Sequence, residues 1–141
     1  MKSKIIVFSC NWNGWSCIDT AISSGFHYPP SVKLIRVSCL SRIHSGLILK
    51  AFELGAEGIM LLGCEPGSCH FGVADDCVNK EYIKTREIMY MLGIPGESLD
   101  LVQLPAFDGS QFIARITRFI DTLDQSALSR RGKQSSTGLK K

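Results

Sequence analysis

Four short apolar runs, rich in β-branched residues, are spaced along the chain and separated by longer segments of mixed polarity. They cover residues 5–8, 32–37, 58–62 and 99–104, and the last run is the weakest. Their composition is typical of buried parallel strands rather than of alternating, half-exposed ones. We therefore expect a sheet whose strands are covered on both faces.

The segments between these runs carry apolar residues at helical spacing. Gly55 is the expected end of one helix, and Gly93 with Pro95 ends another. The poor helix formers Ser23 and Ser24 weaken the case for the first helix. The helices are expected within residues 16–24, 47–54, 82–92 and 112–123.

The alternation of strand and helix predicts an α/β fold. We expect one small open parallel sheet of about four strands, with right-handed crossovers, flanking helices and a flavodoxin-like strand order. A chain of 141 residues is enough for one hydrophobic core. We assign residues 1–125 to the domain and residues 126–141 to a basic, flexible C-terminal tail. The alternative for the tail is an arm that orders on another protein of a complex.

Charge and hydropathy exclude two classes of protein. The net charge of +3 comes in part from the tail, so the body is close to neutral and lacks the basic balance of a nucleic-acid-binding face. No apolar run reaches the roughly 20 residues of a membrane span, and the run after the basic start is too short for a signal peptide. We expect a cytoplasmic protein without a membrane span.

Four of the six cysteines follow the apolar runs. Cys10, Cys39 and Cys64 each come two residues after one of the first three runs, and Cys69 closes the loop that Cys64 opens. Because the carboxyl ends of parallel strands lie at one edge of a sheet, these four thiols are expected to converge there. In a reducing compartment, such thiols more often bind metal or carry redox chemistry than form structural disulfides.

Four converging thiolates suit a cationic centre, either a structural zinc ion or an iron–sulfur cluster. The four-residue gap between Cys64 and Cys69 also occurs between ligands of plant-type [2Fe–2S] ferredoxins, and zinc sites usually use two short knuckles. The spread over three strand ends favours the cluster over zinc. A structural-zinc or metal-free module that only bridges subunits stays open as an alternative.

Neighbouring residues have candidate supporting roles. Gly67 frees a turn whose N–H groups can face a cluster, and His70 is a candidate donor beside Cys69. Trp12 and Trp15 either shield the site or anchor a partner, with capping of the core as the alternative.

Other chemistries have less support. No GxGxxG, P-loop or CxxC motif is present, so dinucleotide, nucleotide and thioredoxin-type sites lack support. A cysteine-dependent enzyme using His44 or His70 would leave the other converging thiols unexplained. Cys17 and Cys77 are expected to be ordinary semi-buried thiols.

Three stretches are similar to the delta subunit of methyl-viologen-reducing hydrogenase: "FSCNW", "YPPSVKLIRVSCLSR" and "ILKAFELGAEGIMLLGCEPGSCHF". The resemblance covers about residues 5–123. It implies a non-catalytic electron-transfer component of an oxidoreductase complex that carries a [2Fe–2S] cluster. Its implied partners are a hydrogenase or formate dehydrogenase and the flavin-containing A subunit of heterodisulfide reductase.

The chain departs from that family's pattern at one cysteine. The family motif Cys-Asn-Trp-Cys ends here in Asn13, which leaves the four strand-end cysteines as the expected ligands. Cys17 is the possible substitute ligand, and loss of the cluster is the other alternative. Arg42 is kept, and its charge would stabilise a reduced cluster; a structural ion pair is the alternative.

Overall fold

The computed structural model describes residues 4–28, 30–40, 43–64, 74–105 and 107–138, with side chains from 74–77 and 126–138 left aside. Within these described residues, four strands and four helices alternate, with a short 3-10 helix, η2, before the last strand. In order they are β1 (Ile5–Cys10), α1 (Asn13–Ser23), β2 (Val32–Val37), α2 (Ser45–Glu53), β3 (Gly58–Cys64), α3 (Ala74–Leu92), η2 (Gly96–Ser98), β4 (Leu99–Leu104) and α4 (Gly109–Gly138).

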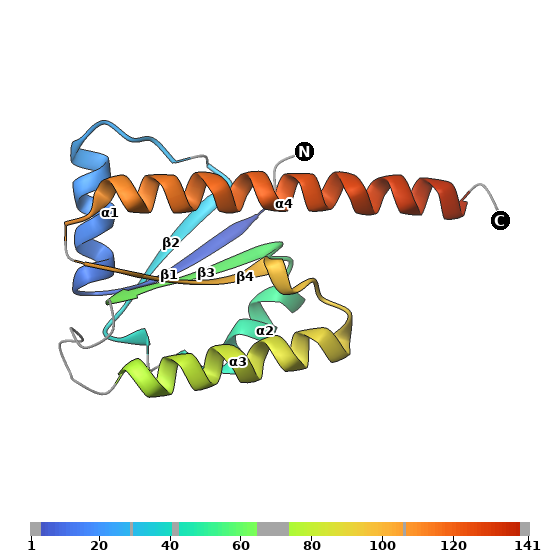
Figure 1. Cartoon of the computed structure of the whole chain (residues 1–141), viewed down its shortest axis with the longest axis horizontal. Helices are drawn as coiled ribbons and strands as arrows, with labels where there is room; N and C mark the ends of the chain where they lie inside the picture. The colour runs from blue at the N-terminus through green and yellow to red at the C-terminus, as the bar shows by residue number, and fades with distance from the viewer. Residues whose placement is uncertain (1–3, 29, 41–42, 65–73, 106, 139–141) are drawn as a thin grey trace.

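All strands are parallel and lie in the order β2-β1-β3-β4. This order confirms the predicted α/β fold with flavodoxin-like connectivity. Helices α1 and α4 cover one face of the sheet, and α2 and α3 cover the other (Figure 1). The structure thus has three layers, with the sheet in the middle.

Alternation along β1 supplies side chains to two separate cores. Ile5 and Val7 pack with α1 and α4, whereas Phe8 and Cys10 pack with residues from the α2 and α3 layer. Every residue of β3 is buried, as expected for a central parallel strand. The helices end where glycine allows a left-handed backbone: Gly55 has φ +111° after α2 and Gly93 has φ +79° after α3.

One strand differs from the expectation of burial on both faces. β2 is an edge strand, and the side chains of Lys33 and Ile35 on it are exposed. Among the described strands only β1 pairs with it, and a groove lies against its outer positions on the α2 side. The apolar run at 32–37 is therefore a strand that is only partly buried.

Several element boundaries differ from the sequence pattern, and α3 begins at Ala74, eight residues earlier than expected. β1 continues to Cys10 and β3 to Cys64, because both cysteines still pair with neighbouring strands, at Val37 and Leu104. Helix α1 begins at Asn13, three residues earlier than expected.

Helix α4 extends beyond the sheet (Figure 1) and continues to Gly138. The backbone of most of the segment assigned to the tail is therefore helical, and its flexibility stays a prediction. Within the described residues, no helix has both the length and the apolar character needed to cross a membrane.

Candidate metal centre

Two of the predicted ligands lie side by side at the carboxyl edge of the sheet. Cys10 is the last residue of β1 and Cys64 is the last residue of the neighbouring strand β3. Their Sγ atoms are 3.8 Å apart, and both residues are buried. The parallel pairing of β1 with β3 brings together two thiols that are 54 positions apart in the chain.

The separation of these sulfurs suits shared binding of one metal ion. It is far longer than a disulfide bond of about 2 Å. In a tetrahedral site with metal–sulfur bonds of about 2.3 Å, two ligand sulfurs lie about 3.8 Å apart. The pair therefore already has the spacing of one edge of a thiolate tetrahedron, whether the metal is zinc or an iron of a cluster.

The first turn of α1 donates a hydrogen bond to this pair. The backbone N–H of Gly14 lies 3.2 Å from Cys10 Sγ. A hydrogen bond from a helix N-terminus stabilises negative charge on sulfur, which favours a thiolate over a thiol. Sequence reasoning did not identify Gly14, although a glycine four residues after a strand-end cysteine was visible.

Gly14 also allows α1 to approach the sheet closely. A Cβ atom at this position would lie 2.7 Å from the carbonyl oxygen of Leu62 and 2.8 Å from Ser9 Oγ. No side chain fits there without movement of the helix or the strand. The hydrogen bond to Cys10 depends on this close approach.

Cys39 is brought toward the same edge by the segment that follows β2. It is buried and belongs to the same packed cluster as Cys10 and Cys64. The next residue, Leu40, reaches as far as β3: its Cδ1 atom would lie 2.5 Å from a Cβ added to Gly63. Because β1 lies between β2 and β3, this segment crosses the carboxyl end of β1.

Cys17 lies in the other layer of the structure. It is fully buried in the core formed with α4, and its thiol donates a hydrogen bond to the carbonyl oxygen of Pro105, 3.1 Å away. Burial is the main cause that raises the pKa of this thiol above its usual value. These surroundings favour a neutral thiol and do not favour Cys17 as a metal ligand.

The two tryptophans have different environments. Trp12 is the N-cap residue of α1 and is 38% exposed beside the cysteine edge, so it is accessible to a partner. Trp15 packs against the α1–α4 core, and the guanidinium carbon of Arg36 lies 4.4 Å from its ring centroid. This arrangement is a cation–π contact that covers one side of Trp15.

Several predicted site residues fall outside the described part of the structure: Arg42, Gly67, Cys69 and His70. The side chain of Cys77, near the start of α3, is also not described. Among the described residues, which do not include Cys69, no three His, Cys, Asp or Glu side chains form a metal-binding group.

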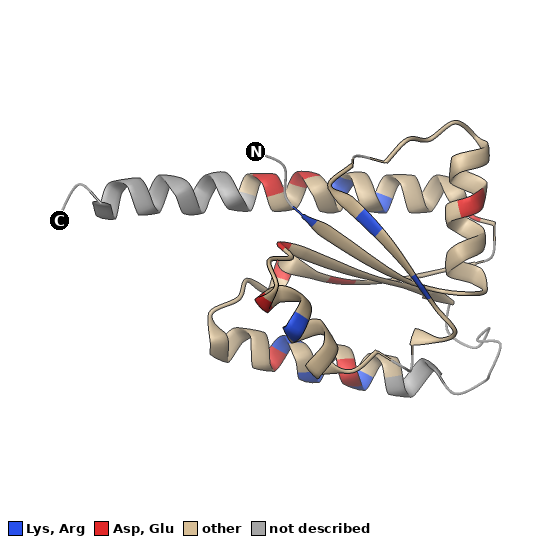
Figure 2. Cartoon of the chain, turned by 180° about the vertical axis from the view of Figure 1, so that it is seen from behind, with Lys and Arg blue, Asp and Glu red and all other residues tan. Residues whose placement is uncertain are grey.

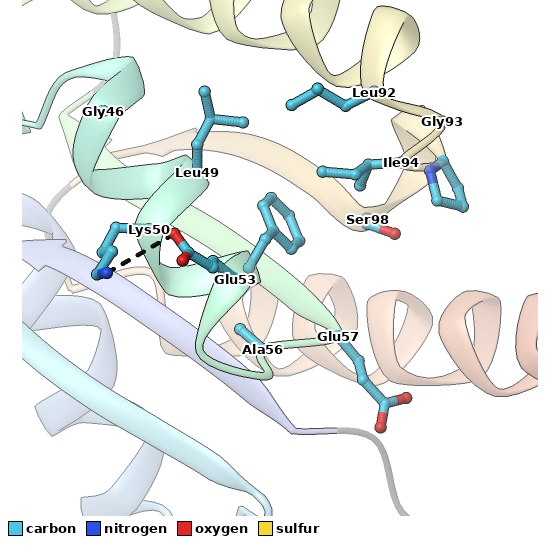
Figure 3. A pocket seen from close by; sticks show the side chains of 12 residues that line it. Gly46, Leu49, Lys50, Glu53, Ala56, Glu57, Leu92, Gly93, Ile94 and Ser98 are labelled. Atoms are coloured by element: carbon cyan, nitrogen blue, oxygen red, sulfur yellow. Dashed lines mark ion pairs between the residues drawn. The ribbon is translucent and has the colours of Figure 1, made fainter.

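His44, one of the two histidines considered for a cysteine-dependent enzyme, lies at the start of α2. His44 is the N-cap of α2, and its Nδ1 accepts a hydrogen bond from the N–H of Leu47. A cavity of about 670 Å³ lies between α2 and the α3–β4 connection, with Leu92 and Ile94 extending toward Leu49 (Figure 3). It is lined by residues that precede β3 and β4, so it lies at the opposite end of the sheet from the cysteines.

Comparison with known proteins shows which family the sequence of this chain matches. The family described as "Methyl-viologen-reducing hydrogenase, delta subunit" matches residues 5–126. The iron-sulfur D subunit of the vhc F420-non-reducing hydrogenase of Methanococcus voltae is 37% identical over 79% of this chain and 77% of its own length. The iron-sulfur D subunit of the F420-non-reducing hydrogenase of Archaeoglobus profundus is 30% identical over 86% of this chain and 89% of its own length.

A third relative is a much longer protein. The A subunit of the ferredoxin:CoB-CoM heterodisulfide reductase of Methanosarcina mazei is 30% identical over 86% of this chain, which corresponds to 15% of that protein. A domain similar to this chain thus also occurs as one part of a larger polypeptide. Together, the family match and the two relatives named as iron-sulfur subunits of hydrogenases show that the chain belongs to the methyl-viologen-reducing hydrogenase delta-subunit family.

Proposed function

We propose that this chain is an electron-transfer subunit that holds one [2Fe–2S] cluster through Cys10, Cys39, Cys64 and Cys69. The observation that carries the proposal is the buried Cys10–Cys64 pair, whose sulfurs are 3.8 Å apart at the carboxyl edge of the sheet. Burial of Cys39 in the same cluster supports a third ligand. Cys69 is included on its sequence position alone, five residues after Cys64.

When bound, the cluster supplies a centre that accepts and donates one electron. The protein groups around it tune this property. The Gly14 N–H stabilises negative charge on Cys10 Sγ, and such a hydrogen bond raises the reduction potential of a cluster. The buried cluster of apolar side chains around the three thiols limits access of water to the site.

The proposed electron path connects two larger proteins. Relatives carry the names of an iron-sulfur component of a hydrogenase and of the A subunit of a heterodisulfide reductase. We infer that this chain relays electrons between a hydrogenase or formate dehydrogenase module and a heterodisulfide reductase A-like flavoprotein. The second of these relatives supports the flavoprotein as a partner, since that A subunit itself contains a similar domain.

A structural zinc ion is the second candidate, because the 3.8 Å sulfur separation fits a tetrahedral zinc site equally well. Absorption and EPR spectra of anaerobically purified protein, together with metal analysis, distinguish the two. We expect a coloured protein with about two irons per chain that gives an EPR signal after reduction. A colourless protein with one zinc ion per chain would refute the cluster.

Cysteine variants test the ligand set. We expect Cys64→Ser and Cys69→Ser to lose the chromophore, because each removes a thiolate ligand. Cys17→Ser and Cys77→Ser are the matched controls and should keep it. Loss of colour in Cys17→Ser would identify this residue as the substitute ligand, and loss in Cys77→Ser would overturn the assignment. A single thiol that reacts much faster than the others with an alkylating reagent would instead favour a cysteine-dependent enzyme.

A further inference from the structure

The face of the sheet beside α2 is incompletely covered at β1 and β2. A groove of about 780 Å³ lies there, between the two strands and α2. Its floor is formed by Ile6 and Phe8 of β1 and Ile35 and Val37 of β2. Parallel sheets normally have both faces covered by helices, so this apolar floor is an unusual surface for a β-α-β fold.

Exposed apolar side chains continue onto the wall of the groove. Leu47, Ala51 and Leu54 of the α2 region line it, and Leu54 is 75% exposed. Ile35 on the floor is 41% exposed. Exposed apolar residues that form one continuous patch, rather than being scattered singly, mark interaction sites.

The rim of the groove is basic. Lys4, Lys33 and Lys50 line it, and no Asp or Glu is among the described lining residues. Figure 2 shows basic residues on β2 and directly before β1, and the sequences of these two strands contain no acidic residue. Lys50 forms an ion pair with Glu53 at 3.7 Å, but both side chains are largely exposed, so that pair contributes little and leaves the rim positive.

We propose that this groove binds an acidic amphipathic helix of a partner protein. A helix fits because it would complete the layer of α2 and α3 on this face, packing beside α2 as helices pack on parallel sheets. Its apolar side would cover Ile35 and Leu54, and acidic residues on its flanks would face the three lysines. No cysteine is among the described residues that line the groove, so the proposal does not rest on the cluster.

Two other occupants are disfavoured by their charge, and an added strand is disfavoured by its geometry. A second copy of this chain placed groove to groove would bring two sets of three lysines together. The chain's own segment 126–141 contains five Lys and Arg residues and no Asp or Glu, so it matches a basic rim poorly. An extended strand added at the edge of β2 would pair with the backbone and leave the apolar floor uncovered.

Photo-crosslinking in the native complex tests the occupant. A benzoylphenylalanine is introduced at Ile35 or at Leu54, and at exposed Thr117 on α4 as a control, because α4 covers the other face. After irradiation of the chain purified with its natural partners, the adducts are mapped by mass spectrometry. We expect the probes at positions 35 and 54 to crosslink to the same acidic amphipathic helix of a partner. The probe at position 117 should not crosslink to that helix. An adduct with a second copy, with a basic or extended segment, or no adduct at either position overturns the proposal.

Charge reversal then tests the rim with the captured segment as a synthetic peptide. We expect Lys4→Glu/Lys33→Glu to weaken binding by about tenfold or more at low salt, with a smaller loss at high salt. Lys84→Glu is the matched control, because the side chain of Lys84 is exposed on α3 and does not line the groove. This variant should bind the peptide as the unchanged protein does. Restoration of binding by a peptide whose acidic residues are replaced with lysine supports the charge pairing. Equal binding by the rim variant and the control would refute it.

Discussion

Replacement of Gly14 with alanine tests the contact that joins α1 to the cysteine edge. The added Cβ would lie 2.7 Å from the carbonyl oxygen of Leu62, 2.8 Å from Ser9 Oγ and 3.2 Å from Cys10 Sγ. The first of these atoms belongs to the backbone of buried β3 and cannot rotate away. The start of α1 must therefore move, which lengthens the Gly14 N–H bond to Cys10 Sγ.

The size of the effect follows from two opposing contributions. Overpacking in a well-packed region costs about 1–3 kcal/mol. Alanine in place of glycine within a helix favours folding by up to about 1 kcal/mol. We therefore expect Gly14→Ala to lower the free energy of unfolding by about 1–2 kcal/mol. If the proposed cluster is present, its absorption spectrum and potential should also change, because a hydrogen bond to one ligand is weakened.

Gly46→Ala is the matched control, because Gly46 is the second residue of α2 just as Gly14 is the second residue of α1. Its Cβ would meet only the side chain of His44, at 3.1 Å from Nδ1, and this terminal side chain needs to shift by only a few tenths of an ångström. Urea denaturation under anaerobic conditions measures both variants. The contact argument is refuted if Gly14→Ala is as stable as Gly46→Ala and leaves the spectrum unchanged.

Two further predictions concern the layer formed by α1 and α4. Gly109→Ala should lower the free energy of unfolding by about 1–3 kcal/mol, because the new Cβ would lie 2.6 Å from the backbone nitrogen of Ala21; an unchanged urea midpoint would contradict this close helix contact. Cys17 should make stability fall at alkaline pH, since its pKa is raised by burial. The contribution of this thiol to the free energy of unfolding is fully present below the unfolded-state pKa of 9.0. It is lost as the pH rises through the folded-state pKa. Urea denaturation at several pH values should show a shallower alkaline decline in Cys17→Ala, and an equal decline would refute this account.

The periodicity of the sequence was sufficient to predict the α/β class, because apolar runs and amphipathic segments alternate along nearly the whole chain. It did not predict that β2 is open on one side. Val32 and Leu34 alternate with Lys33 and Ile35, and this pattern fits an edge strand as well as a buried one. Whether a helix covers Ile35 depends on the sheet order, which short-range periodicity does not contain.

At the candidate site, the positions of Cys10, Cys39 and Cys64 were predictable because parallel strands end at one edge. Predicting that Cys10 and Cys64 are neighbours requires knowledge of the strand order, because the two residues meet only when β1 pairs with β3. The role of Gly14 was not predictable, because it depends on the distance between α1 and the sheet.

The structure bears on Asn13, which stands where the family motif has its second cysteine. Asn13 is the first residue of α1, and the next N–H along the chain bonds to Cys10 Sγ. The same helix turn that would carry a cysteine at position 13 thus contributes to the site through its backbone. Cys17, one turn later, is held in the opposite layer by burial and by its bond to Pro105. A ligand set without position 13 therefore needs no rearrangement of α1, whereas recruitment of Cys17 would require this thiol to leave its core. This difference favours the strand-end cysteines over the substitute.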